Sequence, residues 1–451
     1  MRKGRNIALF LIAALLIVSC RPQADLSRDF PEAETWGETF DIFWKKMSTN
    51  YPFWSLDYGE GRDWDRVYDE YKGKFEELGI VFDEERSAEE QRANTLTAGR
   101  YLFDITKDLS DGHYALMIDD SAENNIQLVP STYRNMKELG YDDDQIFRFF
   151  SDFDGRHAAL YDRYWDHSKE DTAHIMEYSF GLPSTGSGTA TASGALASEY
   201  GFGEMQYVNI AESDGVDELH LVLGKSRDGI VYFSFSAFGI YEYMADADDS
   251  GAENEVSGIV NSFISLVAEP DTTGVIIDLR GNLGGRVAEM SVLWTALMPS
   301  DVDSVRIGET RRKASENRTD YSAWTPFWIK RCTLLEYGTF SKDVPIAVIL
   351  NENSVSCAEM STFTLMALRD NYGYDVRLFG THSCGGTGTL HDASEQLFNA
   401  GITSVSPYIT LMYTPYLQTR YLDGRSYEGT GIPVDEVVPF DAEAFERGDD
   451  R

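Results

Sequence analysis

The chain has 451 residues, and 39 basic side chains are set against 75 acidic ones, which gives a formal net charge of −36. The apolar and aromatic content is that of a globular protein, and this length predicts two or three domains with a real core. So large an excess of carboxylates repels nucleic acids and anionic lipid surfaces, which excludes polyanion binding as a function.

The N-terminus is basic and continues into an apolar run from Ile7 to Val18, with Cys20 shortly after it. This run is too short for an ordinary membrane-spanning helix and predicts a secretory signal. The letters LIVSC resemble the lipobox of bacterial lipoproteins, which implies cleavage before Cys20 and its acylation. We therefore expect a signal peptide over residues 1–19 and a tether over residues 20–35. A plain signal peptide with a chance cysteine is the alternative.

The location expected from this start is a bacterial membrane, with the outer membrane favoured. The soluble body would be exported and held in the periplasm or at the cell surface by its lipid anchor, because two or more acyl chains anchor a protein stably. No later segment is apolar and long enough to predict a spanning helix.

Cysteine usage excludes two kinds of site. Only Cys332, Cys357 and Cys384 follow Cys20. Three cysteines are too few for a disulfide framework, and an odd number cannot all pair within the chain. Neither Cys-x-x-Cys nor His-x-x-x-His spacing occurs, so we expect no metal site and no cofactor.

The first folded region is predicted to be a helical domain over residues 36–115. Its segments FDIFWKKMSTNYPFW, DWDRVYDEYKGKFEEL and AEEQRANTLTAGRYLFDITKDL carry apolar residues three and four apart. We interpret these aromatic stripes as core. Residues 116–224 form an intermediate region of unclear fold, in which the small-residue run from Pro183 to Ser198 predicts a flexible loop.

Strands and helices alternate after Gly229, which predicts a layered α/β domain over residues 225–445. The predicted strands are IVYFSFSAF, GVIIDLR, IAVIL and DVRLFG, and the predicted helices are NEVSGIVNSFISLVAE, VAEMSVLWTALM and CAEMSTFTLMALRDN. Chemistry in such a domain is expected at the carboxyl ends of the strands.

Two strand ends are unusual. GVIIDLRGNLGGR runs into a glycine-rich turn without the lysine of a phosphate-binding loop, so backbone donors for an oxyanion are the better interpretation. These donors would be the amides of Gly284 or Gly285 and of Cys357. After the next strand, Ser356 stands where a helix begins. It is either a nucleophile or a helix cap, because Glu359 follows at capping-box spacing.

The segments DLRGNLGG, NENSVSCAEMS, FGTHSCGGTGT and YEGTGIPVDEVV, in that order, resemble the core of the C-terminal processing (tail-specific) serine peptidases and their tricorn-like relatives. DLSDGHYAL resembles the DGH segment of the tricorn-like branch. The resemblance implies an α/β fold of the crotonase or ClpP type with Ser356 as the nucleophile. It covers most of the chain after the tether, except residues 116–224, where no carboxylate-binding loop of a PDZ module is found.

The base is a histidine if the resemblance holds. In the Ser–Lys branch a lysine stands at the position of Gly386 here, which excludes that dyad. The tricorn-like branch implies His113, whose imidazole has a suitable pKa range for accepting a serine proton. His382, in the loop that lacks the lysine, is the alternative base, and His391 has no motif support. A structural histidine in a turn is the other interpretation of His113.

An orienting carboxylate is implied near the C-terminus, and Glu428 is the nearest match, with Asp111 as an alternative. Asp278, before Arg280, is predicted to hold the glycine turn by hydrogen bonds. The expected function is a serine-type peptidase acting on peptides or protein C-termini. The competing hypothesis is a catalytically inactive binding module on the same fold, which the missing lysine favours.

Overall fold

The computed structural model of the chain forms two compact units. Residues up to 164 form the first unit together with residues 310–325 and 388–419, and the remaining residues form the second. Both later segments lie within residues 225–445, the range predicted for the α/β domain. The described residues are 33–57, 63–119, 125–151, 161, 164, 170–210, 218–240, 251–390, 401–403, 408–441, 443–444 and 447.

The predicted signal peptide and the lipidation site Cys20 lie outside the described residues, as does His391. Within the described ranges, the structure contains no helix with the length and apolar character needed to cross a membrane. Cys332, Cys357 and Cys384 take part in no disulfide bond.

Helices dominate the N-terminal part of the first unit. They are α2 (Trp36–Asn50), α3 (Trp54–Asp57), α4 (Trp64–Leu78), α5 (Ala88–Thr106), α6 (Pro130–Glu138) and α7 (Asp143–Ser151). The Thr35 and Ser87 side chains cap α2 and α5, each as half of a capping box. The aromatic stripes point inward as predicted, and the rings of Phe40 and Phe75 stack with centroids 4.5 Å apart.

A sheet completes the first unit. Its four antiparallel strands run in the order β12, β13, β1, β2, with bounds β12 (Gly401–Thr403), β13 (Ile409–Thr414), β1 (Ala115–Asp119) and β2 (Asn125–Leu128). Part of the intermediate region therefore pairs with a segment almost 300 residues later in the chain. Local periodicity carries no information about such a pairing.

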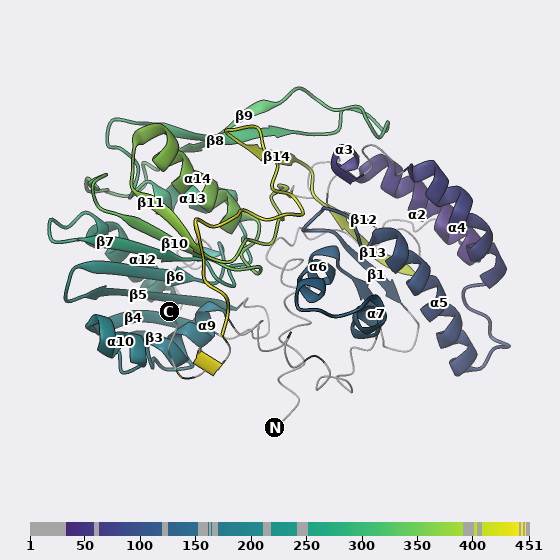
Figure 1. Cartoon of the computed structure of the whole chain (residues 1–451), viewed down its shortest axis with the longest axis horizontal. Coiled ribbons are helices and arrows are strands. Elements are labelled where there is room, and N and C mark those ends of the chain that lie inside the picture. Colours follow the sequence, from purple (N-terminus) through teal and green to yellow (C-terminus); the bar gives the residue numbers. More distant parts are fainter. Residues whose placement is uncertain are drawn as a thin grey trace. The chain divides into compact units, whose positions relative to one another are not determined.

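The second unit is built on one eight-stranded sheet with the order β15, β11, β10, β7, β6, β5, β4, β3 (Figure 1). Its strands are β3 (Gly186–Thr191), β4 (Phe202–Ile210), β5 (Leu219–Ser226), β6 (Ile230–Phe235), β7 (Gly274–Asp278), β10 (Ile346–Leu350), β11 (Val376–Gly380) and β15 (Glu436–Val437). The half from β6 to β15 is parallel, and the half from β3 to β6 is antiparallel.

Helices cover both faces of this sheet. The main core lies on one face, against α12 (Gly251–Val267), α13 (Val287–Trp294) and α14 (Cys357–Tyr372). A smaller cluster lies on the other face, against α9 (Thr172–His174), the π-helix η2 (Ile175–Ser179) and α10 (Ala195–Tyr200). The predicted strands and helices after Gly229 are all present, which confirms the α/β fold class.

The prediction of a flexible loop from Pro183 to Ser198 was wrong. That segment forms β3 and the start of α10. β3 is paired along six residues with β4, so its hydrogen bonds come from the tertiary structure although its composition is that of a linker. A three-stranded sheet with the order β14, β8, β9 completes the fold: β8 (Ser304–Arg311), β9 (Thr325–Lys330) and β14 (Gln418–Tyr421).

Candidate active site

Three loops of the second unit meet where parallel strands end. The strands β7, β10 and β11 are neighbours, and Ile349 is level with Asp278 while Leu350 is level with Gly380. Their carboxyl ends therefore lie at one edge of the sheet, where the residues that follow can meet. Hydrogen bonds join them: Gly281 N–H donates to Asn351 Oδ1 at 3.0 Å, and Cys384 N–H donates to Ser354 O at 3.0 Å.

Ser356 has an unusual backbone. It is the one non-glycine residue in the described ranges with a positive φ, and its angles are φ 61° and ψ −116°. The caps of α2 and α5, Thr35 and Ser87, instead have the extended backbone of ordinary N-cap residues. A positive φ is costly for a residue with a side chain and persists only where surrounding contacts enforce it. Ser356 is therefore more than another helix cap.

The glycine turn after β7 is pressed against this serine. A methyl group on Gly284 would lie 2.5 Å from Ser356 Cβ and 2.9 Å from the Cys357 nitrogen. Asn282 holds the turn in place, since its Oδ1 accepts from Gly284 N–H at 2.9 Å and its carbonyl accepts from Val355 N–H at 3.0 Å. Only a residue without a side chain allows this close approach.

Gly284 and Gly285 differ in what their amides do. Because the Gly284 N–H already donates to Asn282, its amide is committed to the turn. The backbone of Phe238 forms two hydrogen bonds with the turn: its N–H donates to the Gly284 carbonyl, and its carbonyl accepts from the Arg286 N–H. The Gly285 N–H takes no part in this pairing. The Cys357 thiol donates to the Gly285 carbonyl at 2.9 Å, which holds Gly285 beside the first residue of α14.

Glu359, in the first turn of α14, is buried and accepts four hydrogen bonds. The donors are Ser356 N–H at 3.1 Å, Ser383 O–H at 2.6 Å, Gly385 N–H at 2.9 Å and Gly386 N–H at 2.8 Å. Burial raises the pKa of this carboxyl to about 7, although the four donors favour its charged form. Glu359 thereby ties the loop after β11 to the serine.

Gly386, the position predicted to correspond to the lysine of the Ser–Lys branch, is buried, and its carbonyl accepts from Ser356 N–H at 3.2 Å. His382 lies in the same loop and is half-buried. Its Nδ1 lies 2.7 Å from the Ser383 carbonyl, which can only accept, so Nδ1 carries the proton in the neutral ring. The Nε2 atom of the neutral ring then has the lone pair that a base needs.

Asp278 holds the glycine turn through Arg280. Its carboxylate accepts from the Arg280 backbone N–H at 3.1 Å and pairs with the guanidinium at 2.7 Å. The same guanidinium pairs with Glu170 at 2.9 Å, and the Glu170 carbonyl accepts from Asn351 at 2.9 Å. These contacts agree with a structural role for Asp278.

The remaining predicted residues are divided between the two units. Glu428 is buried in the unit of Ser356, where its carboxylate accepts from the Thr387 hydroxyl at 2.8 Å. His113 belongs to the first unit, where its backbone N–H donates to Asp111 Oδ1 at 2.8 Å. Burial lowers the pKa of His113 to about 4, so its imidazole is neutral at pH 7.

The structural roles of three residues of this site were not predicted from the sequence. Glu359 appeared there only as a capping partner, and Asn282 and Asn351 did not appear at all. The one signal was compositional: each asparagine stands just after a predicted strand, where an amide side chain can bond to the backbone of a turn. Their long-range partners come from other strands and leave no trace in local sequence.

The geometry defines a class: an α/β protein with a strained serine at a strand-to-helix turn, against glycine backbone that can donate to an anion. Residues 234–438 match the family model Peptidase family S41. This match confirms the predicted resemblance to the C-terminal processing serine peptidases. The match is to the family as a whole, and the tricorn-like branch stays a prediction.

Solved structures share the fold. A protein from Parabacteroides merdae, described as a peptidase, has 16% identical residues and a TM-score of 0.54, over 93% of this chain and 94% of its own. A mutant of the protein CPAF has 13% identity and a TM-score of 0.50, over 92% of this chain and 94% of its own. The comparison with curated proteins gave no match.

Proposed function

We propose that the protein is a serine peptidase in which Ser356 attacks the carbonyl carbon of a peptide bond. His113 takes the serine proton and returns it to the leaving amine, and water then hydrolyses the acyl-enzyme. The observation that carries the proposal is the backbone of Ser356, with φ 61° at the start of α14. The match to Peptidase family S41 supports the reaction type.

The amides of Gly285 and Cys357 are the proposed oxyanion donors. The Gly284 amide, the other donor predicted with Gly285, is engaged by Asn282. Gly285 is held beside Cys357 by the thiol hydrogen bond. Loss of one such donor typically lowers the rate about 100- to 1000-fold.

His113 is the proposed base because its imidazole is neutral at pH 7 and can accept a proton. Glu428 is the proposed orienting carboxylate. His382 is a second candidate base on a specific observation: its Nδ1 contact with the Ser383 carbonyl places the ring proton on Nδ1, so Nε2 is the basic nitrogen.

A fluorophosphonate probe tests these roles, because it labels only an activated serine. We expect labelling of the wild type that is lost in Ser356→Ala and His113→Ala and retained in His382→Ala. Ser87→Ala, which removes an ordinary capping serine, is the matched control and should label normally. A folded wild type that never labels would support the binding module instead, and labelling lost in His382→Ala but not in His113→Ala would move the base to His382.

The proposed substrates are peptides or protein C-termini. Two peptides of one sequence, one with a free carboxylate and one with a C-terminal amide, separate the alternatives. A C-terminal processing enzyme recognises the terminal carboxylate and should cleave the free acid faster, whereas an endopeptidase cleaving far from the end should treat both alike.

We also propose that the body is held at a membrane through acylated Cys20, on the strength of the lipobox-like sequence alone. In bacterial cells the wild type should then incorporate a clickable fatty acid and sediment with membranes. Cys20→Ser should lose the label and appear in the soluble fraction. A wild type without label would refute the anchor and leave the peptidase proposal untouched.

A further inference from the structure

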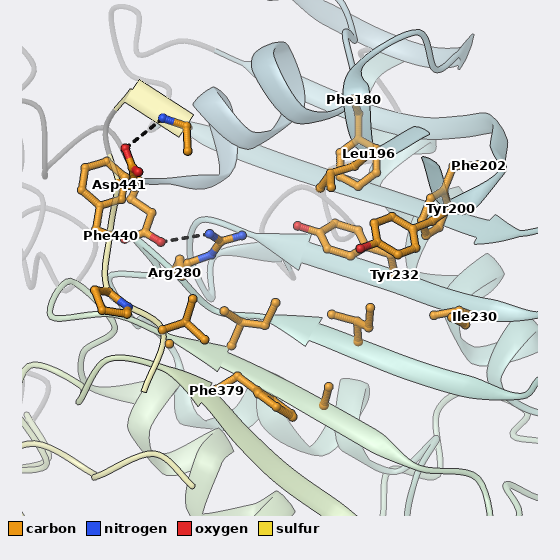
Figure 2. Close-up of a pocket in the computed structure, with 18 residues that line it drawn as sticks. Phe180, Leu196, Tyr200, Phe202, Ile230, Tyr232, Arg280, Phe379, Phe440 and Asp441 are labelled. Atoms are coloured by element: carbon orange, nitrogen blue, oxygen red, sulfur yellow. Dashed lines mark hydrogen bonds and ion pairs between the residues drawn. The ribbon is translucent and has the colours of Figure 1, made fainter. Parts of the chain in front are cut away.

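A cavity of about 600 Å³ opens on one face of the eight-stranded sheet, wholly inside the second unit. Strands β6, β7, β10 and β11 supply its floor, and α10 and the segment after β15 supply its walls (Figure 2). Its lining is rich in aromatic side chains: Phe180, Tyr200, Phe202, Tyr232, Phe379 and Phe440. This volume lies within the range of small-molecule sites, about 300 to 1,000 Å³.

The cavity is separate from the candidate active site. Ala347 and Ile349 of β10 line it, whereas Val348 and Leu350 point into the core that packs against α14. Side chains alternate between the two faces of a strand, so the cavity and the body of α14 lie on opposite faces of the sheet. The peptidase proposal therefore gives this cavity no occupant.

One end of the cavity is polar. Arg280 lies there, paired with Glu170 at 2.9 Å and with Asp278 at 2.7 Å, and Figure 2 shows Asp441 at the same end. The Tyr232 hydroxyl donates to Asp278 at 2.8 Å. The guanidinium contacts two of these carboxylates, and Asp441 is a third at the same end, so the described residues give this end a formal negative charge.

These features decide the charge of a ligand. A carboxylate or phosphate placed in this end would be desolvated beside the net negative charge of the described residues there, which costs several kcal/mol. The guanidinium is already engaged by two carboxylates. An apolar body suits the aromatic walls, since burying apolar surface is favourable at about 25 cal/mol per Å².

We propose that this cavity binds an uncharged, mainly apolar small molecule. Its body lies over the strands among the aromatic rings, and any single polar group lies toward Arg280. Such a ligand would contact the residues that fix the glycine turn, because Arg280 precedes that turn and Asn351 joins Glu170 to Gly281.

The neutral fluorophore N-phenyl-1-naphthylamine is the probe for a binding test on the purified protein. We expect saturable binding of one probe per chain. A matched pair of competitors then tests the charge: 1-dodecanol should displace the probe at a concentration at least about 10-fold lower than dodecanoate, because only the second carries a charge into the negative end.

Variants test the location. Ala347→Trp fills the floor of the cavity and Leu196→Trp fills its α10 wall, and each should lower probe affinity at least about 10-fold. Ala88→Trp, on the exposed start of α5, is the control and should bind as the wild type does. Circular dichroism checks each fold. Non-saturable binding, unchanged affinity in a folded filling variant, or displacement by dodecanoate as effective as by dodecanol would each overturn the proposal.

Discussion

Ser356 carries more backbone strain than an ordinary serine at a helix start. A residue with a side chain held at positive φ outside the common left-handed well costs about 1 to 3 kcal/mol. The strain is enforced by contacts on several sides: Gly386 O and Glu359 both accept from its N–H, and Gly284 packs against its Cβ. Strain of this kind is expected where a side chain must be presented to a substrate.

Replacing Ser356 by glycine should therefore stabilise the fold and abolish the reactivity of the site. We expect Ser356→Gly to abolish fluorophosphonate labelling and to raise the free energy of unfolding by about 1 kcal/mol, because glycine adopts positive φ without a steric penalty. Urea unfolding measures this change. The matched variant Ser87→Gly, at an extended cap, should instead lose a few tenths of a kcal/mol. A Ser356→Gly protein less stable than the wild type would contradict the strain argument.

Glu359 is the residue on which the loop after β11 depends. All four hydrogen-bond partners of the Glu359 carboxylate are donors. In a glutamine variant the side-chain NH2 group, itself a donor, would therefore face at least one N–H or O–H donor. We expect Glu359→Gln to lower the free energy of unfolding by about 1 to 3 kcal/mol and to slow serine labelling.

The control for this variant is Glu90→Gln, at the corresponding position of the exposed capping box of α5. Its amide nitrogen can turn to water, so its stability and labelling should change little. Equal effects at the two glutamates would show that Glu359 acts only as a helix cap.

The pH dependence of stability separates His113 from Glu359 by sign. The pKa of His113 falls from 6.5 to about 4 on folding, so the unfolded chain binds more protons between these values and stability is lost as pH falls through this window. The pKa of Glu359 rises from 4.5 to about 7, so its contribution is present at low pH and is lost as pH rises toward 7.

Urea unfolding from pH 4 to pH 7, within these two windows, checks both signs. Relative to the wild type, His113→Asn should gain stability toward pH 4 by an amount on the order of 3 kcal/mol, and Glu359→Gln should gain stability toward pH 7. Each variant is the other's control. Shifts in the same direction for both would refute the assignment.

At the scale of elements, the site depends on three parallel strands that end level with one another. Turns after β7, β10 and β11 are then close enough to exchange hydrogen bonds, and Gly284 gives the closest approach between two of them. A methyl group there meets the Ser356 Cβ and the Val355 carbonyl, at 2.5 Å and 2.8 Å. The backbone on both sides would have to move.

Gly284→Ala should lower the free energy of unfolding by more than about 2 kcal/mol and abolish labelling, since strain at positive φ adds to the steric overlap. Gly73→Ala is the matched control: this glycine lies in the exposed middle of α4 with no atom within 4 Å of an added Cβ. It should stabilise the protein by about 1 kcal/mol. Thermal unfolding and probe labelling are measured together, and an active, stable Gly284→Ala variant would contradict the close contact.

Elements with strong periodicity were predicted well. The helices α2, α4 and α5 and the strands β6, β7, β10 and β11 follow from spacing alone, because burial repeats every 3.6 or every two residues. β3 could not be predicted in this way, since a run of glycine, serine, threonine and alanine has no apolar alternation. Its strand state comes from pairing with β4, which local sequence does not encode.

At the scale of the whole molecule, the net charge of −36 is the dominant feature. Repulsion among the carboxylates destabilises the compact state and is screened by salt over a Debye length of about 10 Å at 0.1 M. We expect the midpoint of thermal unfolding to rise by roughly 2 to 5 °C between low salt and about 0.15 M sodium chloride. Choline chloride at equal ionic strength should act alike; a midpoint independent of salt would contradict self-repulsion.

The residues with proposed catalytic roles come from both units. Ser356, Glu359 and the oxyanion donors belong to the second unit, whereas His113 and Asp111 belong to the first. The labelling experiment with His113→Ala and His382→Ala therefore also tests whether the enzyme needs both units for its chemistry. If only His382 matters, the second unit alone holds the reactive groups.

The sequence by itself determined the α/β class, the serine at a strand-to-helix turn and the glycine turn beside it, because periodicity and turn residues are local properties. The tertiary structure alone decided the backbone strain of Ser356, the donors from Ser383, Gly385 and Gly386 on Glu359, the close approach of Gly284 to Ser356, and the aromatic cavity. These features arise from strands that are distant in sequence and neighbours in the sheet, and their contacts form only when the chain has folded.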